Sequence, residues 1–175
     1  SKPISVLNDG TNSNETRLGA IGDLQLAIKE FEITDDILVL AGDFLFDFEL
    51  TDFVKFYHQH KSDCITINKW DDPEALKRTG IAEVDQNNRV ITFEEKPEKP
   101  KSNLAVPPIY IYQANTLPLI DRYLTEGNNP DAPGHLIPWL IQHRTVHAYE
   151  FEGYSYDVGT LESYEEVQKV FGGLD

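Results

Sequence analysis

Methionine is absent from this sequence of 175 residues, and cysteine occurs only once. The single Cys64 has no partner for an internal disulfide, and its apolar neighbours indicate a small buried side chain. A chain that folds without disulfides fits a reducing compartment, so we expect a cytoplasmic protein. No apolar stretch approaches the length of a membrane-spanning helix, which argues against a membrane protein.

Basic residues are also scarce. Lys and Arg together number 15 against 30 Asp and Glu, which gives a net charge of −15. This balance argues against nucleic acid and against anionic membrane surfaces as partners. It does not exclude small anionic substrates, because a bound divalent cation reverses the local field. The length suits one domain with a substantial core, and without repeats or linkers we predict a single domain over residues 1–175.

The most informative stretch is the apolar run 37–41, which ends at Gly42 and Asp43. A short, continuous apolar run predicts a strand buried on both faces, as in a parallel sheet covered by helices. In open α/β sheets ligands bind just beyond the carboxyl ends of the strands. Asp43 is therefore a candidate functional carboxylate, and the alternative is that it only caps a turn.

Hydrophobic periodicity predicts alternating strands and helices along the chain. A strand at 4–7, a helix at 18–31 and the strand at 37–41 form a βαβ pattern, which predicts a parallel pair with a right-handed crossover. Two strands around the turn-rich segment 85–88 predict a hairpin. Further helices are expected at 50–61, 117–124, from 136, and at 163–171, and further strands at 63–68, 81–84, 90–93, 105–112 and 146–151. The sequence thus predicts an α/β fold with a mixed, mainly parallel sheet flanked by helices.

A second acid, Asp157, repeats the pattern of Asp43, because it precedes a glycine and the expected start of a helix. If the fold brings the two carboxylates together, they make a hard oxygen site suited to Mg²⁺, an ion that keeps waters and bridges substrate phosphates. With 30 acids in the chain, a chance pairing is the alternative.

The adjacent Glu95 and Lys96 follow an expected strand and suit a sugar phosphate. The carboxylate accepts hydrogen bonds from hydroxyls, and the ammonium meets a phosphate. The alternative is a solvated charged loop. Gly19 and Gly22 lie near a helix start, where backbone amides can take an anion or a flat base, although the spacing matches no dinucleotide or P-loop fingerprint.

Taken in order, these pieces resemble one known family, the sugar-phosphate nucleotidyltransferases, in particular the glucose-1-phosphate thymidylyltransferases and uridylyltransferases. The segments that carry the resemblance are Leu18-Gly19-Ala20, Leu40-Ala41-Gly42-Asp43, Gly80-Ile81-Ala82-Glu83-Val84-Asp85, Phe93-Glu94-Glu95-Lys96-Pro97, Tyr110-Ile111-Tyr112 and Tyr156-Asp157-Val158-Gly159-Thr160. They cover nearly the whole chain. The resemblance implies a Rossmann-like fold and a reaction in which an NTP (dTTP or UTP) and a sugar 1-phosphate give an NDP-sugar and pyrophosphate.

The resemblance also implies roles for individual residues. Asp43 and Asp157 would be catalytic and would hold Mg²⁺ between the phosphate groups. Glu95 would bind sugar hydroxyls and Lys96 the sugar phosphate.

Four further residues are assigned by the same resemblance. Gly80 and Tyr110 would line the sugar pocket, and Gly19 would lie against the nucleobase. Asn14 would occupy the place where relatives use a Gln to read the base. Members of the family are often multimers, so a homo-oligomer is an open alternative to a monomer.

Three departures from the family pattern bear on this interpretation. The N-terminal Gly-Gly-x-Gly-Thr-Arg loop and a later Lys-Pro are not present, so we expect a domain that starts at Ser1 without the N-terminal part of the fold. Phe44 follows the Gly-Asp where relatives have Asn, and Pro107-Pro108 replaces Thr-Gly. The alternatives are a non-catalytic relative that binds a sugar nucleotide or a partner chain, and an unrelated Mg²⁺-dependent α/β phosphotransferase.

Overall fold

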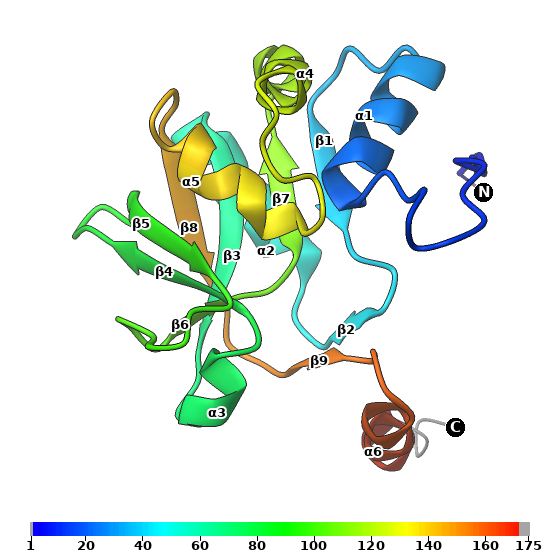
Figure 1. Cartoon of the computed structure of the whole chain (residues 1–175). Coiled ribbons are helices and arrows are strands. Elements are labelled where there is room, and N and C mark those ends of the chain that lie inside the picture. The colour runs from blue at the N-terminus through cyan, green and yellow to red at the C-terminus, as the bar shows by residue number, and fades with distance from the viewer. Residues whose placement is uncertain (1, 172–175) are drawn as a thin grey trace.

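The computed structural model, which describes residues 2–171, is organised around strand β3, Asp63–Lys69 (Figure 1). Cys64, Ile65 and Ile67 of this strand are almost completely buried. The strand predicted at 63–68 is thus confirmed, and it is buried because both faces of β3 are covered by helices.

The described strands form one large sheet and one small pair. In the large sheet the hydrogen-bonded order is β1-β7-β3-β6-β4-β5, and β8 pairs with the other edge of β3. The strands of this sheet besides β3 are β1 (Ile37–Leu40), β4 (Gly80–Val84), β5 (Val90–Glu95), β6 (Leu104–Val106), β7 (Ile109–Tyr112) and β8 (Val146–Glu150). The expected single strand at 105–112 is interrupted at Pro107-Pro108, and its two parts, β6 and β7, both pair with β3.

The α/β class is confirmed, but the prediction of a mainly parallel sheet is wrong. Only the β3–β8 pair is parallel among the described strands, and the other pairs run antiparallel. The prediction of a parallel sheet rests on the run at 37–41, which predicts a strand buried on both faces, and β1 is not buried in this way. Leu38 and Leu40 are 40% and 43% exposed, and β1 lies at the end of the strand order with β7 as its neighbour.

The predicted strand at 4–7 is also wrong. The backbone there joins no strand, and Ile4 and Val6 are each 90% exposed. The βαβ unit and its parallel pair are consequently absent from the described chain. Ser1 and residues 172–175 of the predicted domain lie outside the described residues.

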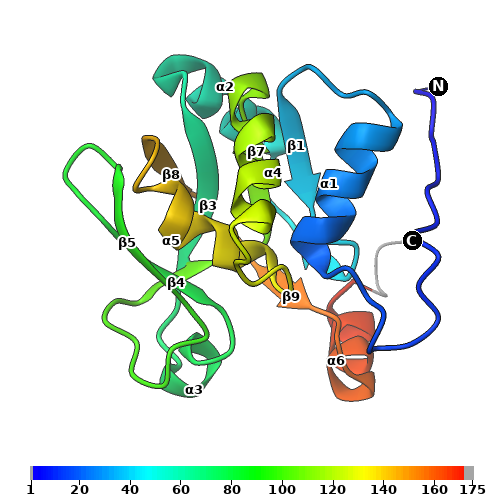
Figure 2. The same ribbon diagram turned by 45° about the horizontal axis from the view of Figure 1, so that its top comes forward.

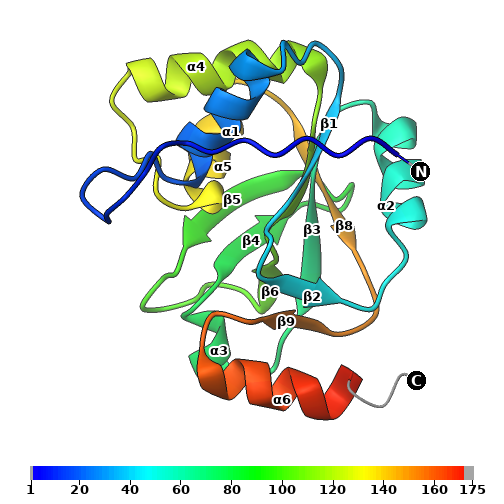
Figure 3. The ribbon, with the colours of Figure 1, turned by 90° about the vertical axis from the view of Figure 1, so that its right-hand side faces the viewer.

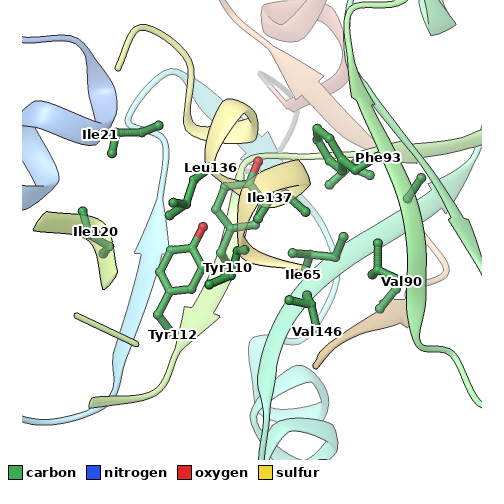
Figure 4. Close-up of a cluster of buried hydrophobic side chains, with 14 of the residues drawn as sticks. Ile21, Ile65, Val90, Phe93, Tyr110, Tyr112, Ile120, Leu136, Ile137 and Val146 are labelled. Atoms are coloured by element: carbon green, nitrogen blue, oxygen red, sulfur yellow. The ribbon is translucent and has the colours of Figure 1, made fainter. Parts of the chain in front are cut away.

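Three helices pack on one face of the sheet, as Figures 1 and 3 show: α1 (Ala20–Glu30), α4 (Leu117–Thr125) and α5 (Leu136–Leu140). Ile21, Ile120 and Ile137 project from them into the main core. There they meet the strand residues Tyr110 and Tyr112, which lie beside Leu136 and Ile137 (Figure 4). Burial of such side chains contributes about 1.5–3 kcal/mol each, so this layer supplies much of the stability.

The opposite face is covered by α2, Leu50–His60 (Figure 3). Phe53 and Tyr57, four residues apart on one helix face, pack against Cys64 and Ile111. Cys64 is completely buried, as predicted, and burial raises the pKa of its thiol to about 12.

The hairpin predicted from the turn signals is present. β4 and β5 pair antiparallel, with a register shift between Glu83 and Val84. The turn is held by the Asp85 carboxylate, which accepts backbone hydrogen bonds from Asn87 at 2.8 Å and Arg89 at 3.0 Å. Side-chain acceptance of this kind is what makes Asp common in turns.

The short helix α3, Pro73–Leu76, precedes β4. The Asp72 carboxylate accepts a 2.9 Å hydrogen bond from the amide of Glu74, and Pro73 has no amide hydrogen that would need a partner. Asp72 as the N-cap and Pro73 as the first helical residue therefore both favour a helix start here. The short 3₁₀ segments Ala114–Thr116 and Pro133–His135 lead into α4 and α5.

A separate two-stranded pair, not foreseen as strands, joins β2 (Phe44–Phe46) to β9 (Ser155–Asp157). Helix α6, Leu161–Phe171, follows β9. In the ribbon views α3 and α6 lie at the same end of the molecule as β9 (Figures 2 and 3). Within residues 2–171, no helix has the length and apolar character needed to cross a bilayer.

Candidate functional site

Two acids far apart in sequence are brought together by the β2–β9 pair. Asp43 precedes β2, Asp157 ends β9, and Phe44 lies directly opposite Asp157 in the register. The amide of Val158 donates a 2.8 Å hydrogen bond to the carbonyl oxygen of Asp43, so the pairing continues past the strand end. Both acids are exposed and line one cavity.

The donor set of this acid pair suits a hard cation. Neither Asp43 nor Asp157 forms an ion pair with any basic side chain in the described part of the chain, so both carboxylates are open to a ligand. No group of three or more His, Cys, Asp or Glu side chains is arranged around a metal position within the described residues. Two carboxylates leave room for waters and phosphate oxygens, which is how proteins commonly hold Mg²⁺.

Glu95, the last residue of β5, lies directly opposite Gly80 of β4, and both residues line the cavity. The carboxylate occupies space that is available only because glycine stands at two positions. A Cβ at Gly134 would lie 1.9 Å from Glu95 Oε2, and a Cβ at Gly80 would lie 3.3 Å from the same atom. Burial raises the pKa of the Glu95 carboxyl, and the charges of Lys96 and His135 offset part of that effect.

The next residue, Lys96, has a left-handed backbone conformation with φ of 48°, which is uncommon for a residue with a side chain. Its amide donates to the carbonyl oxygen of Thr79 at 3.1 Å. This bond prolongs the β4–β5 pairing by one step and fixes the place where the chain leaves the sheet. Lys96 lines the same cavity as Glu95.

Tyr110 forms the floor of the cavity from strand β7 and is only 2% exposed. Its ring lies 6.0 Å from that of Tyr112, measured between centroids. Burial, and then the negative charge of Glu95, raise the pKa of the Tyr110 hydroxyl, so it stays protonated and can donate a hydrogen bond.

The cavity has a volume of about 440 Å³. Six of the residues predicted from the sequence line it together: Asp43, Gly80, Glu95, Lys96, Tyr110 and Asp157. A second cavity of about 430 Å³ adjoins it, and the two share Ala41, Pro108, Tyr110 and Pro133 as wall residues. The site therefore has two adjoining compartments at the end of the sheet where β1 and β5 finish.

Two predicted residues are not part of the first cavity. Asn14 is exposed in a turn and lines neither cavity. Gly19 is buried against the neighbouring loop, where a Cβ would lie 2.5 Å from the carbonyl oxygen of Pro130. The following residue, Ala20, lines the second cavity, and its amide donates to Asp131.

Sequence reasoning missed several wall residues. Arg78 lies in the turn between α3 and β4, Gly134 lies in the 3₁₀ segment before α5, and Ser163 lies in the first turn of α6. No periodicity or motif singled out these positions. Trp70 packs against the small cluster of Leu76, Ile81 and Ala105 and also lines the cavity.

Comparisons with known proteins agree with this geometry. A family model described as "Nucleotidyl transferase" matches residues 8–171. The glucose-1-phosphate adenylyltransferase of Fervidobacterium nodosum is 38% identical over 133 residues, which cover 74% of this chain and 32% of that protein. The chain thus spans about a third of the length of the curated relatives that it matches.

Solved structures give the same fold. A crystal structure from Bacillus anthracis, described as a glucose-1-phosphate thymidylyltransferase in complex with a sucrose, has a TM-score of 0.70 and 28% sequence identity, and the alignment covers 90% of this chain and 62% of that one. A UDP-glucose pyrophosphorylase complexed with UDP-glucose has a TM-score of 0.75 at 19% identity, covers 88% of this chain and 62% of that one, and supports the fold alone.

Proposed function

The chain belongs to the nucleotidyl transferase family, and on that premise we propose that it joins an NTP to a sugar 1-phosphate and releases pyrophosphate. One observation carries the proposal. The cavity at the end of the sheet is lined by an acid pair, Asp43 and Asp157, and by the adjacent Glu95 and Lys96. The acid pair suits phosphates bridged by a cation. Glu95 and Lys96 suit a hydroxylated, phosphorylated substrate.

The proposed reaction needs no covalent intermediate. An oxygen of the sugar phosphate attacks the α-phosphorus of the NTP, a P–O bond forms, and the bond to the β-phosphate breaks to release pyrophosphate. The protein has to hold two anions in line and neutralise their charge. The two adjoining cavities, which share Tyr110 and Pro108, give each substrate a compartment next to the other.

Asp43 and Asp157 are the residues that would hold Mg²⁺. When bound, the ion would neutralise charge on the phosphates of both substrates. Glu95 would accept hydrogen bonds from sugar hydroxyls, and the protonated Tyr110 hydroxyl would donate one. The ammonium of Lys96 would meet the sugar phosphate.

The sugar proposed is glucose 1-phosphate, because it appears in the names of both the curated relative and the Bacillus anthracis structure. The two names differ in the base, adenylyl in one and thymidylyl in the other. The family resemblance of the sequence implies dTTP or UTP, and the more similar relative adds ATP as a third candidate. A nucleotide panel is therefore part of the test.

The test measures the pyrophosphate released from ATP, dTTP or UTP, each in turn, when the chain is incubated with that nucleotide, glucose 1-phosphate and Mg²⁺. We expect release with one of the three nucleotides and loss of release without the sugar phosphate. Binding of glucose 1-phosphate without turnover is the result expected of a non-catalytic relative, and it would overturn the enzymatic part of the proposal. If the chain binds neither glucose 1-phosphate nor any of the three nucleotides, the whole proposal is overturned.

A cytoplasmic location, expected from the sequence, stays a prediction, and self-association, which the family resemblance leaves open, stays an alternative to a monomer. Cell fractionation tests the first, and light scattering coupled to gel filtration tests the second.

A further inference from the structure

Arg78 occupies a place next to the residues assigned to the sugar phosphate, although no sequence pattern pointed to it. It lies two residues before Gly80 and lines the same cavity as Lys96. Its amide donates to Ala75 at 3.0 Å, which closes the turn after α3. Because the following Thr79 accepts from the amide of Lys96, the backbone holds the two basic residues at the same strand end.

Neither of these two basic side chains is held in an ion pair in the described part of the chain, although the charge of Lys96 acts on the nearby Glu95 carboxyl. Within the described residues, Arg78 and Lys96 form no ion pair and no side-chain hydrogen bond, although three carboxylates line the same cavity. The neighbouring Lys77, by contrast, pairs with Glu74 at 2.5 Å and does not line the cavity. In a chain of net charge −15, two unpaired cations that line one cavity mark a place for an external anion.

We propose that Arg78 binds the phosphate of the sugar 1-phosphate together with Lys96. This assignment rests on the proposed function and extends it to a residue outside the family motifs identified in the sequence. A phosphate monoester carries more than one negative charge near neutral pH, so one ammonium leaves it incompletely neutralised. A guanidinium presents two parallel N–H donors that match two phosphate oxygens, which a lysine at this position would not.

The test compares Arg78→Gln with Lys77→Gln. Both substitutions remove one positive charge from adjacent exposed positions, so they change the overall field equally. Binding of glucose 1-phosphate to the whole chain is measured by isothermal titration calorimetry, with glucose and inorganic phosphate as separate probes. Thermal unfolding of each variant checks that the fold is retained.

We expect Arg78→Gln to raise the Kd for glucose 1-phosphate about tenfold or more, as for loss of hydrogen bonds to a charged group. Lys77→Gln should leave that Kd within about twofold. Arg78→Lys should fall between the parent and Arg78→Gln, because it keeps the charge and loses the paired donors. Binding of inorganic phosphate should weaken in Arg78→Gln as well, whereas binding of glucose should not.

The outcomes separate this inference from the proposed function. If the parent chain binds glucose 1-phosphate and Arg78→Gln binds it equally well, the inference fails and the proposed function stands. If Lys77→Gln loses as much affinity for glucose 1-phosphate as Arg78→Gln does, the effect comes from the overall charge of the protein, and the inference is overturned. If the parent chain binds neither glucose 1-phosphate nor any NTP, the proposed function fails first.

Discussion

The backbone amide of Val158 donates a 2.8 Å hydrogen bond to the carbonyl oxygen of Asp43, and this contact holds the two acidic strand ends side by side. Neither acid lies in the large sheet. Asp157 ends β9 and Asp43 directly precedes β2, so both lie at the small β2–β9 pair, whereas Glu95 and Lys96 lie at the end of β5. The candidate site is thus assembled from two separate sets of strands.

The acid pair gives the first prediction. Asp43→Asn and Asp157→Asn should each lower pyrophosphate release about 100-fold or more, because each removes a charge that would hold the cation against the phosphates. Asp35→Asn, at an exposed position away from the cavity, should leave the rate unchanged. Steady-state kinetics on the three variants check this, and full activity in Asp43→Asn would remove that residue from the site.

Metal removal gives the second prediction. Chelation of divalent cations should abolish pyrophosphate release, and added Mg²⁺ should restore it, because two carboxylates and two phosphorylated substrates repel one another without a cation. The assay titrates Mg²⁺ into chelator-treated protein. Release that persists at full rate in excess chelator contradicts the assignment of Asp43 and Asp157 as cation ligands.

The close approach of Gly134 to Glu95 gives the third prediction. Gly134→Ala places a Cβ within 1.9 Å of the position now held by Glu95 Oε2, so the carboxylate has to move. We expect a loss of about 1–3 kcal/mol in the free energy of unfolding and a raised KM for the sugar phosphate. Urea unfolding and kinetics measure the two effects.

A double-mutant cycle makes this third prediction specific. In a Glu95→Ala background the contact with the carboxylate is gone and only the approach to Phe93 Cζ at 3.0 Å remains, so Gly134→Ala should cost less stability there than in the parent. An equal cost in both backgrounds would show that the two residues are not coupled.

The buried carboxyl of Glu95 gives the fourth prediction. Burial raises the pKa of this carboxyl in the folded protein above the ordinary value of 4.5. At a pH between 4.5 and the raised pKa, the folded protein therefore binds the proton more tightly than the unfolded chain does. The contribution of Glu95 to stability therefore falls as pH rises through this window. Glu95→Gln should gain stability relative to the parent as the pH rises above 4.5.

Urea unfolding at several pH values, compared with the exposed control Glu98→Gln, checks this fourth prediction. A difference between Glu95→Gln and the parent that does not change with pH would contradict it.

The core gives the fifth prediction. Ile65 is completely buried in β3, whereas Ile91 in β5 is 54% exposed. Ile65→Ala should cost about 2–5 kcal/mol in the free energy of unfolding, because it leaves a cavity in the main core. Ile91→Ala should change that free energy by only about 0.5 kcal/mol. Chemical unfolding of the two variants tests whether the sheet is packed as described.

Local signals predicted the elements that are stabilised by nearby residues. The β4–β5 hairpin followed from its turn residues, and α1 and α2 followed from apolar residues spaced three and four apart. Pairing between distant strands was not predictable in this way. The run at 37–41 has the composition of a buried strand, but burial depends on which neighbours the fold supplies, and Leu38 and Leu40 remain exposed.

In the candidate site, too, local sequence signals predicted some residues, whereas others depend on contacts between distant segments. Asp43, Glu95 and Lys96 follow strands with clear patterns, so their positions beyond strand ends could be inferred. β2 and β9 are three residues each, too short for a periodic signal, and their pairing is known only from the fold. Arg78 and Gly134 were missed because their roles depend on which atoms approach them, and the residue type alone does not indicate this.

The order in which the strands appear along the chain has a consequence for synthesis. Asp43 emerges from the ribosome early, whereas Asp157 follows only after every strand of the large sheet has been made. A nascent chain that has reached β8 can pair the whole large sheet and still has only one of the two acids. Since domains fold as they are made, the described sheet can form before the two acids of the candidate cation site come together.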